Sequence, residues 1–160
     1  MDIYQLINDF SYKTFKTIGG TSKFITFKGQ SLIDSWEELE GEVYKNFDNK
    51  GKKDGFDARV HGAFLVMEKG KAILFTERIK VQAELLPYKI INVKKDFVFI
   101  NIQNIIEGIN NEGVSHLKRM ELYRNKDLYF YEEASMNVIF RDATSETKLF
   151  CTQELENILS

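Results

Sequence analysis

The residues that most often carry catalysis or hold metals are few in this chain, and they stand apart. Neither His61 nor His116 has a Cys, Asp or Glu around it at the spacing of a metal site. Cys151 alternates onto the same side as Leu149, as a small core residue would. We therefore expect the histidines to be satisfied or solvent-exposed, and the cysteine to be a core residue and not a nucleophile.

Sequence motifs of the common enzyme classes are missing as well. The chain has no GxSxG elbow, no glycine loop of the phosphate-binding type and no HExxH helix. The polar loop "DNKGKKDG" (48–55) carries Asp48 and Asp54, but Lys50 and Lys52 stand where a calcium loop needs oxygen ligands. We expect no metal, no cofactor and no catalytic residue. A pair of catalytic carboxylates has no fixed spacing, so the sequence leaves that possibility open.

An acidic stretch is the other feature that could carry a function. Glu37, Glu38 and Glu42 lie in a predicted helix over 35–47, and the last two form a like-charge pair four residues apart. Such a pair costs a helix about 0.2–0.5 kcal/mol. One interpretation is a solvated helix face whose acidic side chains in the first turn interact favourably with the helix dipole. The other is an acidic docking surface for a basic partner.

The pattern of apolar residues predicts the elements that would position these side chains. The helix over 35–47 has a capping-box spacing at Ser35 and Glu38, and one apolar face formed by Trp36, Leu39, Val43 and Phe47. A second helix is predicted over 77–86, capped by Thr76 and stopped by Pro87, and a third after Thr152.

Short alternating or apolar runs between polar turns predict the strands. The segment 1–10 fits a helix or a strand, and 104–116 fits a short helix or turn followed by a loop. A hairpin is predicted with its turn at 68–71. Strands are expected at 24–27, 59–67, 72–75, 88–93, 97–102, 120–123, 128–131, 137–140 and 148–151. The expected architecture is α+β, a single domain over 1–160 with a mostly antiparallel β-sheet and three or more covering helices.

Composition narrows the class of partner. The 160 residues carry a formal net charge of -2, which gives no general electrostatic reason to bind nucleic acid or anionic lipid. No apolar stretch approaches the length of a membrane span, and the first residues lack the pattern of a signal peptide. With a single cysteine that can form no internal disulfide, the expected location is the cytoplasm.

Several segments, taken in order, resemble a family of bacterial immunity proteins associated with polymorphic toxin systems. The family that these segments resemble is called the immunity protein of the eleventh type, and it was formerly catalogued as a domain of unknown function. The matching stretches are "IYQL", "FKGQSL" with Trp36, "GFDARVHG", "AILFTERIKVQAELLPYKI", "DFVFINIQNIIEGIN" and "IFRDATSETKLFCTQELENIL". They cover most of the chain, and the last three are the most specific. Asn110 departs from the pattern, where an Asp is more usual.

The resemblance implies a protein that binds a cognate toxin domain and neutralises it by stoichiometric blockade, without catalysis of its own. It also favours a strand for "IYQL". Tight protein complexes use aromatic or Arg anchors ringed by polar groups. Candidate contact residues are therefore the solvent-facing members of a set formed by Tyr129, Tyr131, Glu132, Glu133 and Arg141, together with the acidic stretch.

Two hypotheses from other classes remain at this point. A small enzyme or ligand-binding domain acting on a polar metabolite would need a deep pocket, lined by Arg59, His61 and carboxylates. A structural domain would self-associate through exposed sheet edges, whereas an immunity protein is expected to be a monomer before it meets its toxin.

Overall fold

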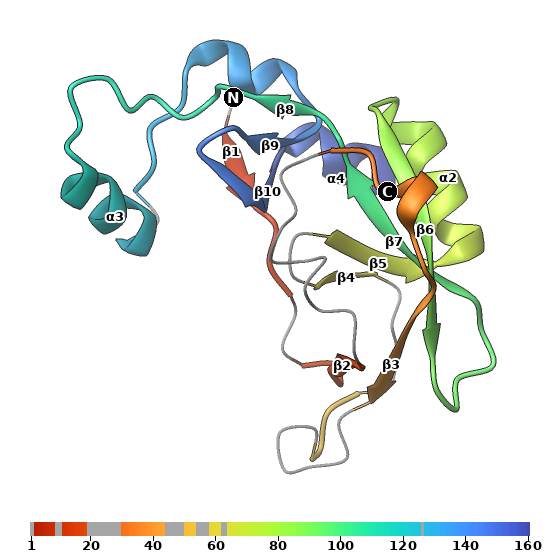
Figure 1. Ribbon diagram of the computed structural model, residues 1–160. Coiled ribbons are helices and arrows are strands. Elements are labelled where there is room, and N and C mark those ends of the chain that lie inside the picture. The colour runs from red at the N-terminus through yellow and green to blue at the C-terminus, as the bar shows by residue number, and fades with distance from the viewer. Residues whose placement is uncertain are drawn as a thin grey trace.

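The chain forms two β-sheets, with α2 (Lys69–Ile79) packed on the larger and α4 (Gln153–Leu159) on the smaller, so the α+β expectation is confirmed. The computed structural model describes residues 2–8, 11–18, 30–43, 50–53, 58–61, 64–125 and 127–160. The strand predicted at 24–27 and half of the loop 48–55, namely residues 48, 49, 54 and 55, lie outside these residues. Figure 1 shows the larger sheet, the smaller sheet near the N-terminus, and helix α3 standing away from both.

The larger sheet has six strands in the order β2-β3-β6-β7-β5-β4. Its β3–β6 pair is parallel and its other pairs are antiparallel. The strands are β2 (Phe15–Ile18), β3 (Leu39–Val43), β4 (Ala58–His61), β5 (Phe64–Glu68), β6 (Ala83–Ile90) and β7 (Phe97–Ile102).

The smaller sheet has four strands in the order β1-β10-β9-β8, and its β8–β9 pair is parallel. The strands are β1 (Ile3–Gln5), β8 (Ile105–Ile106), β9 (Ile139–Asp142) and β10 (Ser145–Thr152). The helices are α2 (Lys69–Ile79), α3 (His116–Asn125) and α4 (Gln153–Leu159), with 3-10 turns η1 (Ile33–Ser35) and η3 (Glu132–Met136). The strand that the resemblance favours for "IYQL" is confirmed by β1.

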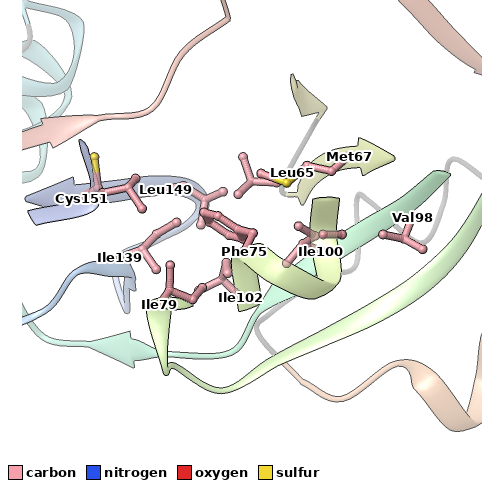
Figure 2. Close-up of a cluster of buried hydrophobic side chains, with 12 residues drawn as sticks. Leu65, Met67, Phe75, Ile79, Val98, Ile100, Ile102, Ile139, Leu149 and Cys151 are labelled. Carbon is pink, nitrogen blue, oxygen red and sulfur yellow. The ribbon is translucent and has the colours of Figure 1, made fainter. Parts of the chain in front are cut away.

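One apolar cluster joins the two sheets to α2 and α4. Val98, Ile100 and Ile102 of β7 point to one side, because alternate residues of a strand face opposite sides of its sheet. Figure 2 shows Ile100 and Ile102 with Phe75 and Ile79 of α2 and with Ile139 and Leu149 of the smaller sheet. The other buried members of the cluster are Leu65, Met67, Ala72, Cys151 and Leu155 of α4. The shared core therefore fixes the smaller sheet against the larger one.

An aromatic cluster occupies the opposite face of the larger sheet. Phe99 lies at its centre, with ring centroids 4.3 Å from Tyr88, 5.5 Å from Phe64 and 5.7 Å from Trp36. The Trp36 indole N–H donates to the Pro87 carbonyl oxygen at 2.9 Å. These ring contacts bury a large apolar area and tie the segment before β3 to β6.

The helix predicted over 35–47 is wrong over 35–43, and residues 44–47 lie outside the described part of the structure. The chain makes the single turn η1 and then enters β3, which pairs with β2 on one side and β6 on the other. Leu39 and Gly41 are buried while Glu40 is exposed, which is the alternation of a strand. Pairing along both edges of β3 outweighs the helical spacing of the apolar residues. The predicted capping box at Ser35 and Glu38 is therefore absent.

Gly41 lies where β3 passes Tyr88, and a side chain there would collide with it. A Cβ on Gly41 would stand 1.8 Å from the Tyr88 Oη and 2.6 Å from its Cζ. The Gly41→Ala variant is expected to lose about 1–3 kcal/mol of its free energy of unfolding, as overpacked sites do. In a Tyr88→Phe background the nearest atom is gone, so the same change should cost less in denaturant unfolding. Equal costs in the two backgrounds would show that the clash with the hydroxyl is not the cause.

The stretch 68–90 also differs from its prediction. Glu68 ends β5, and the rest of the expected turn at 68–71 and the expected strand at 72–75 belong to α2, which buries Ala72, Phe75 and Ile79. Thr76 caps nothing, because it lies inside α2 and its hydroxyl donates to backbone carbonyls of the preceding turn. The helix ends at Lys80, whose φ of 52° places it in the left-handed region.

Pro87 lies inside β6 and does not stop a helix. The Gln103 N–H donates to the Gln82 carbonyl and the Ile91 N–H to the Gly41 carbonyl, so odd-numbered residues of β6 direct their backbone groups toward β3. Pairing with β3 begins only at Tyr88. The nitrogen of Pro87 therefore faces a side of the strand that is not yet paired, where a proline is tolerated.

The remaining strand predictions are mixed. The strand at 97–102 is confirmed by β7, and the predicted strand at 120–123 is wrong because these residues belong to α3. The one predicted at 128–131 makes a single bridge, from Phe130 to Ile109, and the one at 137–140 begins later, at Ile139. The final helix begins after Thr152 as predicted, although the threonine side chain makes no capping hydrogen bond.

Candidate interaction surface

The segment 129–136 brings exposed aromatic, apolar and acidic side chains together at one end of the molecule. Tyr129 is 66% exposed, Tyr131 is 39% exposed and Met136 is 83% exposed. Glu132 and Glu133 are also exposed, in the first turn of η3. We call Tyr129, Tyr131, Glu132, Glu133 and Met136 the tyrosine surface.

Backbone and core contacts hold the tyrosine surface in place. The Asn110 N–H donates to the Tyr129 carbonyl at 2.7 Å, and the Tyr131 N–H donates to the Gly108 carbonyl at 2.8 Å. Between the two tyrosines, Phe130 points the other way, with ring centroids 5.3 Å from Phe150 and 6.2 Å from Phe140. The exposed side chains therefore stand on an ordered backbone, which lowers the entropy lost on binding.

A buried carboxylate supports the strip of chain that pairs with this segment. Asp142 is 1% exposed and accepts the backbone N–H of Gly108 at 2.8 Å and of Ile109 at 2.7 Å. Its other oxygen accepts the Thr144 N–H at 2.8 Å and the Thr144 hydroxyl at 2.6 Å. Because all four donors are internal, Asp142 is a scaffold residue whose loss would release residues 108 and 109.

Arg141 is not a surface residue, so its proposed place among the solvent-facing contacts is wrong. Its side chain is 0% exposed, and its Nε–H donates to the Ile102 carbonyl at 2.7 Å. The residue pairs with Ile105 of β8 and links the ends of β7, β8 and β9. A buried guanidinium bonded to backbone in this way acts in packing, not in partner contact.

The acidic stretch lies elsewhere and is not helical. Glu37 and Glu38 are exposed just before β3, and Glu42 on β3 forms an ion pair with Lys16 at 2.9 Å. Figure 1 shows β3 and β8 at opposite ends of the structure, and residues 108–110, which hold the tyrosine surface, follow β8 directly. The two sets of candidate residues therefore do not form one site.

The described surface has three hollows large enough to hold a small ligand. The first, about 590 Å³, lies beside β1 and is lined by Asp2, Ile3, Tyr4, Gln5, Ile7, Leu128, Phe130 and Phe150. The second, about 610 Å³, lies at the β6–β7 turn and has Lys69, Lys89, Lys94 and Lys95 in its wall with Glu38 and Asp96. The third, about 400 Å³, lies between β1 and α4.

Arg59, which the metabolite-binding hypothesis requires in a pocket wall, lines none of these three hollows and is 6% exposed. The side chain of its proposed partner His61 lies outside the described part of the structure. Within the described residues, no group of three or more His, Cys, Asp or Glu side chains could hold a metal ion.

The carboxylate of Glu84 is bound internally and is not presented to a ligand. Its oxygens accept the Ser31 hydroxyl, the Leu32 N–H at 2.9 Å and the Asn101 amide at 2.9 Å. Burial works to raise the pKa of Glu84, but these hydrogen bonds outweigh it and the pKa is lowered. The group therefore ties residues 31 and 32 to β6 and β7.

Cys151 is a buried core residue, as its alternation with Leu149 indicates. Burial raises the pKa of its thiol to about 11. We expect the folded protein to resist alkylation at pH 8 and the unfolded protein to react readily. Because the folded pKa is raised above the value of 9.0 for a free thiol, stability should fall as the pH rises from 9 toward 11. Rapid alkylation of the folded chain, followed by mass spectrometry, would contradict this assignment.

No family model matches the chain, and a search of curated proteins found no match to it. No described helix is long and apolar enough to cross a membrane.

One residue of the tyrosine surface and one buried residue that supports it were not predicted from the sequence. Met136 carries no distinguishing pattern, and it is exposed because η3 turns its side chain outward. Asp142 is adjacent to Arg141 and was not singled out either. Its role depends on amides more than 30 residues away, as the Gly108 separation of 34 residues shows. The alternation of Tyr129, Phe130 and Tyr131 was the readable signal, since it places the tyrosines on one side of the backbone.

Proposed function

We propose that this protein is an immunity protein that binds a cognate toxin domain one-to-one and blocks its active site or substrate entry. The ordered sequence segments that resemble such a family support the proposal. A cytoplasmic location goes with it, since a toxin that enters the cell is met there. The protein acts by its shape, so it needs no cofactor and no catalytic residue.

The observation that carries the proposal is the composition of the tyrosine surface. Tyrosine and methionine are enriched in protein interfaces, and a few aromatic anchors supply most of the binding energy. The side chain of Met136 is 83% exposed, and leaving its apolar area in water is unfavourable unless a partner covers it. The tyrosines and the methionine would form the centre of the interface.

Charge indicates the kind of partner. Glu132 and Glu133 stand beside the tyrosines, and Glu107 is exposed next to Gly108, which binds the Tyr131 N–H. Acidic groups at the rim of an interface attract a basic partner and speed its association. The favoured toxin domain is one with a basic surface around its active site.

Co-expression tests the proposal. The chain is produced together with the toxin domain encoded by the neighbouring open reading frame, and growth and co-purification are measured. Wild-type protein should restore growth and co-purify with the toxin. A Leu74→Ala variant is the control, because Leu74 is an exposed apolar residue of α2 away from the tyrosine surface, and it should behave as wild type. Failure of the wild-type chain both to restore growth and to co-purify would refute the proposal.

A further inference from the structure

The outer edge of β1 presents hydrogen-bonding groups that have no backbone partner within the described residues. In β10, the Thr152 N–H donates to the Val138 carbonyl, so Thr152 directs its backbone groups toward β9 and Cys151 directs its own toward β1. Tyr4 pairs with Cys151, and the Leu6 N–H donates to the Leu149 carbonyl. The backbone groups of Ile3, Gln5 and Ile7 must then point away from β10, toward the outer edge of the sheet, where none of the described strands pairs with β1.

This edge lacks the devices that usually protect a sheet from pairing with another chain. Protected edges carry lysine, proline, bulges or inward charges. Here the outward row Ile3, Gln5 and Ile7 is uncharged, and Ile7 is 60% exposed. The adjoining hollow of about 590 Å³ has an apolar floor formed by Leu128, Phe130 and Phe150.

We propose that β1 pairs with β1 of a second copy of this chain, antiparallel and about a two-fold axis at Gln5. This register places Gln5 opposite the partner's Gln5 and Ile3 opposite the partner's Ile7. Residues of the same parity share a sheet face, so the partner's Ile7 lies on the face of the hollow that Ile3 helps to line. Each exposed Ile7 is thereby covered by the apolar floor of the other copy.

Charge is compatible with this pairing and favours a second copy over a charged partner. The outward row Ile3, Gln5 and Ile7 contains no charged side chain, so the pairing brings no like charges together. Asp2 falls opposite the partner's neutral Asn8. The contact is self-complementary, since the same edge supplies both the apolar residue and the hollow. It joins two smaller sheets into one continuous sheet. The tyrosine surface is not part of the paired edge, so the inference does not depend on the proposed function. A dimer leaves Tyr129 and Tyr131 available to a toxin domain, and it replaces the monomer expected from the sequence.

Cross-linking tests the register. Directly opposed residues in a hydrogen-bonded antiparallel pair have Cα atoms about 5.5 Å apart, within the range of a disulfide. A Gln5→Cys variant should therefore form a disulfide-linked dimer under mild oxidation. An Ile3→Cys variant is the matched control, because the two-fold separates the two copies of residue 3 by roughly 14 Å, four residues along the strand. The native Cys151 contributes little background, since it is buried.

Sedimentation velocity of the full chain over a range of concentrations tests association itself. Wild-type protein should shift from monomer to dimer, and Ile7→Lys and Gln5→Pro should stay monomeric. The proline removes an outward N–H only, so the ladder to β10 is kept. Leu74→Lys, a matched charge on an exposed site, should dimerise like wild type. A wild-type chain that is monomeric throughout, an Ile7→Lys variant that still dimerises, or equal cross-linking of Gln5→Cys and Ile3→Cys would overturn the proposal.

Discussion

An Asp142→Ala variant is expected to lose about 3 kcal/mol or more of its free energy of unfolding. The substitution leaves the Gly108 and Ile109 N–H groups and the Thr144 donors without their acceptor in a buried site. Each hydrogen bond to a charged group contributes about 1.5–3 kcal/mol, and an unsatisfied buried donor adds its own desolvation cost. Denaturant unfolding monitored by circular dichroism measures the change.

Asp127→Ala is the control for this experiment, because Asp127 is exposed and its removal should change stability by less than about 0.5 kcal/mol. The loss at Asp142 should be accompanied by faster hydrogen exchange at residues 108 and 109, the amides it binds. A stability loss at Asp142 no larger than that at Asp127 would show that the carboxylate does not hold this part of the chain.

Replacing both tyrosines of the tyrosine surface is expected to weaken the toxin complex by about 2 kcal/mol or more, roughly a 30-fold rise in Kd. Tyr129 and Tyr131 are exposed in the free chain, so their truncation removes contact area from the interface and little from the core. The free energy of unfolding of Tyr129→Ala/Tyr131→Ala should therefore stay within about 0.5 kcal/mol of wild type. Titration of the immobilised variant with the toxin domain measures the affinity.

A second pair of variants separates the apolar and charged parts of this surface. Glu132→Lys/Glu133→Lys should slow association and make the rate less sensitive to salt, because rim charges act mainly on the encounter. Glu37→Lys/Glu38→Lys provides the matched reversal at the other end of the molecule, before β3. An equal loss from both charge reversals would place the interface elsewhere or show that net charge alone matters. An unchanged affinity of the double tyrosine variant would remove the tyrosine surface as the interface.

The sequence predicted the elements whose local pattern and tertiary role agree. β7 is a run of apolar residues interrupted only by Asn101 and buried on both faces, and the strand that leads into Thr152 and α4 is confirmed as well. The helix predicted from 35 onward is wrong over 35–43 because two periods coexist there. Helical spacing from Trp36 competes with the alternation of Leu39, Gly41 and Val43, and pairing with β2 and β6 decides between them.

The stretch 68–90 shows the opposite error. Ala72, Phe75 and Ile79 have the spacing of a helical face, but Gly70 suggested a turn and Pro87 suggested a helix end. The proline is accommodated because β3 begins to pair one residue later, which no local pattern reveals.

The candidate surface was predictable only in part. The alternation around Phe130 exposes both tyrosines, whereas the burial of Arg141 depends on the Ile102 carbonyl, 39 residues away.

Calorimetric titration of the purified toxin domain with this chain, with toxin activity followed in parallel, tests the central claim most directly. Binding by blockade predicts saturation at one chain per toxin domain, with activity lost in proportion to the chain added. It also predicts that activity returns when the complex is dissociated. No heat of binding, or complete loss of toxin activity at a small fraction of one equivalent, would contradict the account, since only a catalyst inactivates many targets per molecule.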